Sequence, residues 1–201
     1  AEKLQGEAKD LEQGSAFHQH VRIMASDDYS VSANSHLVIV TAGAAQQPGE
    51  SRLNLLERNV AIMKHVIPKV LAFSPSASIC IVANPCDIMT AVASKIAGPS
   101  VPAGRIFGSG TCLDSSRLRS MLAKRLELDA SSVQGYILGE HGDSSVPIWS
   151  SVSIGGVPLL PSGQDPDDVH DQMHKAVVDS AYDVIERKGS TNWAIGLTSG
   201  T

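Results

Sequence analysis

The spacing of apolar residues along the chain predicts strands that alternate with helices. Residues 37–40 and 79–83 are short, continuous apolar runs rich in β-branched side chains, a pattern typical of parallel strands buried on both faces. Between them, residues 52–73 carry an apolar side chain at every third or fourth position, which predicts a long helix kinked at Pro68. The order strand, helix, strand predicts α/β architecture with a right-handed parallel sheet.

Weaker patterns extend this plan in both directions. An amphipathic helix is expected at residues 1–13, ending at Gly14, and a short strand is expected near residues 21–23. Residues 87–96 predict another helix, and residues 105–107 predict the strand that follows it.

The second half of the chain has shorter apolar runs and more turn-forming residues. Its expected elements are a helix at 114–126, a strand at 133–138, an antiparallel hairpin at 146–157 that turns at Gly155 and Gly156, a surface loop at 158–168 and a helix at 169–187. We interpret the change as a boundary between one domain at residues 1–108 and another at residues 109–201.

The composition is that of an ordinary soluble globular protein. The 201 residues are 42% hydrophobic and 18% charged, with a formal net charge of −5. The sequence has no cluster of basic residues that could bind the phosphates of a nucleic acid, which argues against nucleic acid partners. It has no apolar run long enough to span a bilayer, which argues against membrane partners. Three cysteines without metal-ligand spacing favour a reducing compartment, so we expect a cytoplasmic protein. His170 and His174 lie one helical turn apart, but without a carboxylate or cysteine partner we expect a solvated helix face and no metal site.

Residues 139–145 hold the most informative polar run. His141 stands there between Glu140 and Asp143, among glycines and serines. Histidine is the side chain whose ordinary pKa allows it both to give and to take a proton near neutrality, and glycine lets the backbone approach a ligand. The run is typical of a catalytic imidazole, although a surface turn has the same composition.

Charged residues elsewhere supply the groups that such a histidine needs. Asp114 and Arg117 lie one helical turn apart and therefore face the same side, where a carboxylate can orient an imidazole and a guanidinium can grip a substrate carboxylate. Arg52 follows a polar segment that resembles a lid. The alternative for Asp114 and Arg117 is an ordinary surface ion pair, and the alternative for Arg52 is a solvated charge at the start of a helix.

The loops that follow the first two predicted strands are the expected ligand side of an open α/β sheet. Thr41, Ala42 and Gly43 follow the first strand, and their small side chains let a flat or phosphorylated cofactor lie against the backbone. Asn84 follows the second strand, which ends near Val82, and offers a donor and an acceptor together. The alternative is that these residues only mark the change from strand to loop and bind no ligand.

Taken together, these segments resemble the L-lactate dehydrogenases of vertebrate type, within the lactate/malate dehydrogenase family. The matching segments recur in that family's order and at close to its spacing, and they are residues 40–43, 46–52, 84–88, 108–110, 113–119, 139–145 and 193–197. The resemblance implies reversible hydride transfer between NADH and pyruvate to give L-lactate. It also implies that the sheet is a partial doubly wound, Rossmann-type sheet lacking its first strands, followed by part of an α+β substrate domain.

The resemblance assigns the catalytic roles residue by residue. His141 corresponds to the proton donor and acceptor, and Asp114 to the carboxylate that orients it. Arg52 corresponds to the arginine that polarises the ketone, and Arg117 to the clamp on the substrate carboxylate. Thr191 corresponds to a threonine of the substrate pocket.

The same resemblance assigns the cofactor and the substrate preference. Asn84 would contact both nicotinamide and substrate, with Thr41, Ala42, Gly43 and Val82 on the NAD side, and the bond from Asn84 to Pro85 is expected to be cis. A neutral Gln46 favours pyruvate, because relatives that act on malate place an arginine there to meet a second carboxylate.

The departures from the family pattern leave two further readings open. Ala45 stands where an arginine usually reaches the phosphates of NAD, and the glycine-rich phosphate loop is expected to precede residue 1. A truncated, non-catalytic product with a structural or subunit-interaction role is therefore the first alternative. Malate dehydrogenase is the second, disfavoured by Gln46. The family pattern also implies a homo-oligomer, a tetramer.

Overall fold

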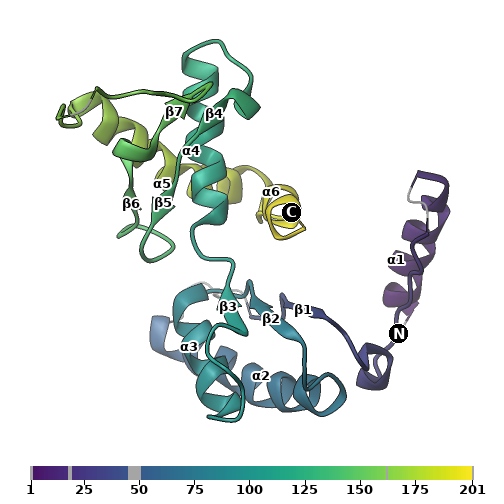
Figure 1. The fold of residues 1–201 in the computed structure, drawn as a ribbon. Coiled ribbons are helices and arrows are strands. Elements are labelled where there is room, and N and C mark those ends of the chain that lie inside the picture. The colour runs from purple at the N-terminus through teal and green to yellow at the C-terminus, as the bar shows by residue number, and fades with distance from the viewer. Residues whose placement is uncertain (1, 18–19, 45–50, 162, 201) are drawn as a thin grey trace. The chain divides into compact units, whose positions relative to one another are not determined.

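A computed structural model describes residues 2–17, 20–44, 51–161 and 163–200, except for the side chain of Arg52 (Figure 1). The chain divides into two compact units, each described by itself. The first comprises Ala1–Cys80 and Ala91–Phe107, and the second comprises Ile81–Thr90 and Gly108–Thr201. The predicted domain boundary after residue 108 stays a prediction.

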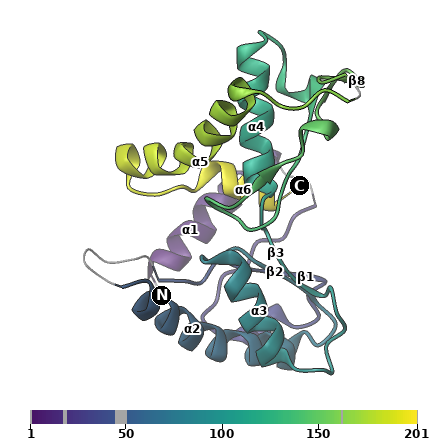
Figure 2. The ribbon, with the colours of Figure 1, turned by 90° about the vertical axis from the view of Figure 1, so that its left-hand side faces the viewer.

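A three-stranded parallel sheet confirms the α/β prediction. Its strands lie in the order β1 (Leu37–Val40), β2 (Ser78–Ile81) and β3 (Ile106–Gly108), connected through α2 (Arg52–Phe73) and α3 (Cys86–Ala97). These bounds lie within three residues of the predicted ones. Both helices lie against the same face of the sheet, as Figures 1 and 2 show from two directions.

The exposure of β1 differs from the prediction that this strand is buried on both faces. Val40 is only 4% exposed, whereas Leu37 is 50% and Ile39 is 40% exposed. Side chains alternate between the two faces of a strand, so the helix-covered face buries one set and leaves the other set open. A continuous apolar run does not reveal which face a helix covers.

The long helix α2 forms where the apolar periodicity predicts it. The side chain of Ser51 caps its N-terminus by accepting a hydrogen bond from the Asn54 backbone, and Met63 and Ile67 are fully buried on one face. Pro68 lies inside the helix.

Asn59 is a buried polar residue on α2 that fastens the loop after β1. Its side-chain oxygen accepts a hydrogen bond from the Ala44 N–H at 2.7 Å, and its amide nitrogen donates to the Ala44 carbonyl at 3.4 Å. A fully buried amide needs such partners, because leaving one unmade costs about 1–3 kcal/mol.

The N-terminal part of the chain is partly as predicted. Helix α1 (Glu2–Gln13) is followed by Gly14, whose N–H donates to the Leu11 carbonyl at 3.0 Å, and short 3-10 helices follow at Ser15–Phe17 and Tyr29–Ser32. The strand predicted near residues 21–23 is wrong, since this segment has no regular secondary structure. A strand needs a neighbour for its backbone hydrogen bonds, and among the described residues β1 pairs with β2 alone.

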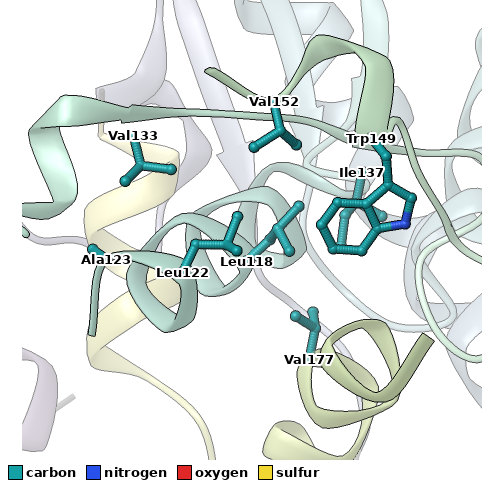
Figure 3. Packing of buried hydrophobic residues seen from close by; sticks show 8 residues of the cluster. All are labelled: Leu118, Leu122, Ala123, Val133, Ile137, Trp149, Val152 and Val177. Atoms are coloured by element: carbon teal, nitrogen blue, oxygen red, sulfur yellow. The ribbon is translucent and has the colours of Figure 1, made fainter. Parts of the chain in front are cut away.

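The second unit is built on two helices, α4 (Cys112–Arg125) and α5 (Asp168–Lys188), with the short helix α6 (Trp193–Ser199) after them. A cluster of buried apolar side chains forms its core and is shown in Figure 3: Leu118, Leu122, Ala123, Val133, Ile137, Trp149, Val152 and Val177. The cluster fixes α4 in place, and α4 carries Asp114 and Arg117.

Two small antiparallel sheets complete this unit, together with 3-10 helices at Ala130–Ser132 and Trp149–Ser151. The first contains β4 (Val133–Gln134), β7 (Ser153–Ile154) and β8 (Val157–Pro158), and the second pairs β5 (Ile137–Leu138) with β6 (Val146–Pro147).

The structure corrects two predictions for these strands. The single strand predicted at 133–138 is divided at Gly135 between the two sheets; a Cβ there would lie 3.2 Å from the Val152 side chain. The predicted hairpin does turn at Gly155 and Gly156, both at positive φ, but only β7 and β8 form it, because β6 pairs with β5.

The loop before α5 is mainly exposed, as predicted. None of the helices in the described part of the chain has the length and hydropathy that a membrane crossing requires.

Candidate active site

The loop at 139–145 joins β5 to β6 and holds His141 at the end of a hairpin. Ile137 pairs with Pro147 and Leu138 pairs with Val146. Gly139 and Gly142 have φ values of 86° and 124°, which side chains rarely tolerate, so the glycines of this run form the turn.

Two adjacent residues of α4 hold this hairpin. The hydroxyl of Ser115 accepts a hydrogen bond from the Ile137 N–H at 2.9 Å and is buried. Asp114 directly precedes Ser115 and reaches His141 further along the same strand and loop. The core cluster that fixes α4 therefore also fixes the position of the imidazole.

Asp114 binds His141 and Arg117 through different oxygens. Its Oδ2 lies 2.6 Å from His141 Nδ1, and its Oδ1 lies 3.1 Å from an Arg117 terminal nitrogen. The Asp114 side chain is 5% exposed, whereas those of Arg117 and His141 are 15% and 25% exposed. The carboxylate is thus a buried support, and the two groups it holds are more exposed than it is.

This contact determines how His141 exchanges protons. An ionised carboxylate only accepts hydrogen bonds, so Nδ1 carries the hydrogen toward Asp114 and Nε2 is the ring atom left to give or take a proton. The hydrogen bond to Asp114 raises the pKa of His141 above its ordinary 6.5, although burial opposes this. The charges of Asp114 and Asp87 raise it further, and that of Arg117 lowers it.

Asp87 contacts His141 in a way that the sequence reasoning missed. Its carboxylate accepts a hydrogen bond from the His141 backbone N–H at 2.9 Å. Asp87 belongs to a segment that carries the family resemblance, but the two residues are 54 positions apart. No local spacing links them, so only the tertiary structure reveals the pair.

The segment that precedes Asp87 contains the predicted residue for nicotinamide and substrate. Asn84 is exposed beyond the end of β2, and the Asn84–Pro85 bond is cis, as predicted. Val82 is half-buried where β2 ends.

The remaining predicted residues are not brought to His141 by any described contact. Thr41, Ala42 and Gly43 are exposed after β1, in the first unit. Thr191 is half-buried between α5 and α6, in the second unit.

Two predicted residues, Arg52 and Gln46, cannot be placed as side chains. Arg52 is the first residue of α2, but its side chain lies outside the described structure. Gln46 lies outside the described residues altogether.

The expectation of a solvated face for His170 and His174 is wrong. His170 Nδ1 lies 2.6 Å from Asp167, the residue that caps α5, and its ring packs edge-on against Trp149 with centroids 4.6 Å apart. The Nε2 atom of His174 lies 3.1 Å from the hydroxyl of buried Ser145. Both histidines therefore have structural contacts within the second unit.

Comparison with known families agrees with this geometry. Residues 1–108 match the model of the lactate/malate dehydrogenase NAD binding domain, and residues 111–199 match that of the lactate/malate dehydrogenase alpha/beta C-terminal domain. The chain belongs to the lactate/malate dehydrogenase family.

Several relatives of this chain are L-lactate dehydrogenases. It is 51% identical to the L-lactate dehydrogenase B-A chain of Danio rerio and 52% identical to the B chains of Squalus acanthias and Mus musculus. Each alignment covers 98% of this chain and 60% of the relative. The chain thus spans about three fifths of the length of these relatives.

Within the first unit of this family member, Thr41, Ala42 and Gly43 form an exposed stretch of backbone with small side chains, which suits the approach of a flat, polar ring system such as nicotinamide. Asn84 belongs to the second unit and is exposed.

Proposed function

We propose that this chain carries the proton-transfer and substrate-carboxylate groups of an NAD-dependent L-lactate dehydrogenase, which interconverts pyruvate and L-lactate. The 2.6 Å contact between Asp114 and His141 Nδ1, with Arg117 on the other oxygen of the same carboxylate, is the observation that carries the proposal. Identity of about half to the lactate dehydrogenases supports it.

His141 acts as the general acid when pyruvate is reduced. Its Nε2 gives a proton to the carbonyl oxygen as the carbon becomes tetrahedral, and Asp114 stabilises the imidazolium before the transfer. In the reverse direction neutral His141 takes the hydroxyl proton of lactate. Its raised pKa keeps more of the imidazole protonated near neutrality, which favours reduction.

Arg117 binds the carboxylate of the substrate. A guanidinium has five N–H donors, and the contact with Asp114 engages one of its terminal nitrogens. The outer edge of the fork therefore remains for a planar carboxylate, which arginine matches better than lysine does. A carboxylate held there beside His141 places a 2-keto group within reach of the imidazole.

The cofactor and the remaining contacts follow from the family. NADH, when bound, supplies the hydride. Its nicotinamide end would be held by the residues that the family pattern assigns to it: Asn84, Thr41, Ala42, Gly43 and Val82.

The contacts with the substrate outside the His141 cluster belong to the same proposal. Arg52 would polarise the ketone, and Thr191 would line the substrate pocket. Neutral Gln46 would leave the extra charge of oxaloacetate unpaired. The division into a cofactor domain at 1–108 and a substrate domain at 109–201, a cytoplasmic location and a homotetramer are also proposed, and all rest on the family pattern.

A binding and turnover experiment on the 201-residue chain tests the proposal. NADH fluorescence is titrated with the chain, and NADH oxidation is then followed with pyruvate or oxaloacetate. We expect NADH binding and faster turnover of pyruvate. Binding without turnover would favour the non-catalytic alternative, absence of binding would exclude activity of this chain, and faster oxaloacetate turnover would indicate malate dehydrogenase.

A further inference from the structure

The backbone of His141 is held by a carboxylate that the proton-transfer chemistry does not use. Asp87 lies in the first turn of α3 and accepts the His141 N–H at 2.9 Å. Both residues belong to the second compact unit. The hydrogen bond to an ionised acceptor is of the stronger kind, and it joins a helix start to a hairpin loop far away in the sequence.

The loop needs such an anchor because its backbone is intrinsically permissive. Gly139 and Gly142 flank His141 at positive φ, and glycine loses more conformational freedom than other residues when it is fixed. Asp114 holds the ring at Nδ1, whereas Asp87 holds the main chain. Two attachment points restrict both the position and the orientation of the imidazole.

The start of α3 is itself firmly held. Cys86 is buried, its thiol donates toward the Ile81 carbonyl at 3.3 Å, and the Gly110 N–H donates to its sulfur at 3.4 Å. The Met89 N–H donates to the Pro85 carbonyl at 2.9 Å. Asp87 therefore lies in a well-packed helix start, three positions after Asn84.

We propose that Asp87 is a positioning residue that fixes the His141 backbone against the segment carrying Asn84. Asp87 then keeps the proton-donating imidazole in a fixed position relative to the amide assigned to nicotinamide and substrate, because only three positions separate Asp87 from Asn84. This inference rests on the proposed function. It predicts that the catalytic contribution of Asp87 comes through its hydrogen bond and not through its charge alone.

Several charged groups surround His141, so the experiment must separate charge from geometry. Asp114 and Arg117 face the ring from α4, and Asp87 faces the backbone from α3.

Glu140 adjoins His141 in the loop, where its carboxylate accepts a hydrogen bond from the Ser144 hydroxyl at 2.8 Å. Asp143 lies 3.3 Å from the hydroxyl of Tyr182 on α5. Glu140 therefore provides a matched control, with a similar charge and no bond to the His141 backbone.

The test compares Asp87→Ala, Asp87→Asn and Glu140→Gln in the whole chain. Backbone amide exchange and the pKa of His141 are measured by NMR, and pyruvate reduction is measured in parallel. Asp87→Ala should speed exchange of the His141 amide roughly tenfold, because its acceptor is lost. It should lower kcat roughly tenfold to a hundredfold through misplacement, with a smaller change in KM.

Asp87→Asn keeps an acceptor oxygen without the charge. It should lower the His141 pKa, yet keep the amide exchange slow and restore most of kcat. Glu140→Gln should leave exchange and kcat near those of the parent chain.

Equal amide exchange in the parent chain and in Asp87→Ala would overturn the inference, as would a kcat for Asp87→Asn as low as that of Asp87→Ala. If Asp87→Ala fails to fold, the parent chain and Asp87→Asn decide: fast His141 amide exchange in either rejects the hydrogen bond. Failure of the proposed function is recognised separately, as absence of pyruvate turnover in a parent chain whose His141 amide is protected.

Discussion

His141 Nδ1 lies 2.6 Å from Asp114 Oδ2, and the carboxylate is almost completely buried while the imidazole remains a quarter exposed. This pairing keeps one nitrogen occupied and the other available to a substrate. It also stabilises the protonated ring in a place where burial alone would destabilise it.

Replacing Asp114 should show how much the pairing contributes. Asp114→Asn keeps the size of the side chain but removes the charge, so the pKa of His141 should fall and pyruvate reduction should slow by roughly 10²–10⁴-fold. Asp167→Asn is the matched control, because Asp167 makes the same 2.6 Å contact with His170 on α5. A control variant that slows the reaction as much as Asp114→Asn would contradict the assignment.

The raised pKa of His141 predicts a pH dependence of stability. The folded chain binds this proton more tightly than the unfolded chain, so the contribution is complete below the ordinary value of 6.5 and is lost as pH rises through the folded pKa. Urea unfolding of the parent chain and of His141→Gln should therefore differ more at about pH 6 than at about pH 9. A difference that grows with pH would show that folding lowers this pKa.

Arg117→Lys should weaken binding of the substrate carboxylate. Lysine keeps the charge but loses the planar pair of donors, and charge-assisted hydrogen bonds contribute about 1.5–3 kcal/mol, so KM for pyruvate should rise roughly tenfold to a hundredfold. Arg119→Lys is the control, since Arg119 donates to the Val133 carbonyl at 2.7 Å instead. The clamp is excluded if KM for pyruvate responds equally to both substitutions.

The amide of Asn59 should matter for stability. Asn59→Leu leaves the Ala44 N–H and carbonyl without these partners, so the free energy of unfolding should fall by about 1–3 kcal/mol. Asn54→Leu, at an exposed position of α2, should change it by less than about 0.5 kcal/mol. Denaturant titration of both variants checks this, and equal stabilities would show that the Ala44 contacts contribute nothing.

Two glycine substitutions should act in opposite directions. A Cβ at Gly108 would lie 2.7 Å from the Thr90 hydroxyl and 2.9 Å from Cys86 Sγ, so Gly108→Ala should destabilise the fold by about 1–3 kcal/mol. Gly6 lies inside α1 with no neighbour within 4 Å of a Cβ, so Gly6→Ala should stabilise α1 by roughly 0.5–1 kcal/mol. Thermal melting and helix content by circular dichroism measure both, and a destabilised Gly6→Ala would refute the open environment.

The elements that local spacing determines were predictable from the sequence. The period of apolar residues in α2 and the short runs of β1 and β2 identify a strand–helix–strand order. The pair Asp114 and Arg117 was also predictable, because one helical turn places both on one side.

Features that depend on tertiary contacts were not predictable in this way. Pairing partners decide that residues 133–138 form two strands and that residues 21–23 form none. The bond from His141 to Asp87 spans 54 positions. Asn59 occupies a core-facing position in an apolar repeat, and that one polar interruption was the signal available for it.

The pH dependence of pyruvate-driven NADH oxidation, measured for this chain and for His141→Gln, tests the central claim most directly. We expect the rate of the parent chain to fall as pH rises through a pKa above 6.5, and we expect His141→Gln to lose nearly all activity at every pH. Turnover by His141→Gln equal to that of the parent chain, or a parent rate that rises through this pH range, would contradict the assignment of His141 as the proton donor.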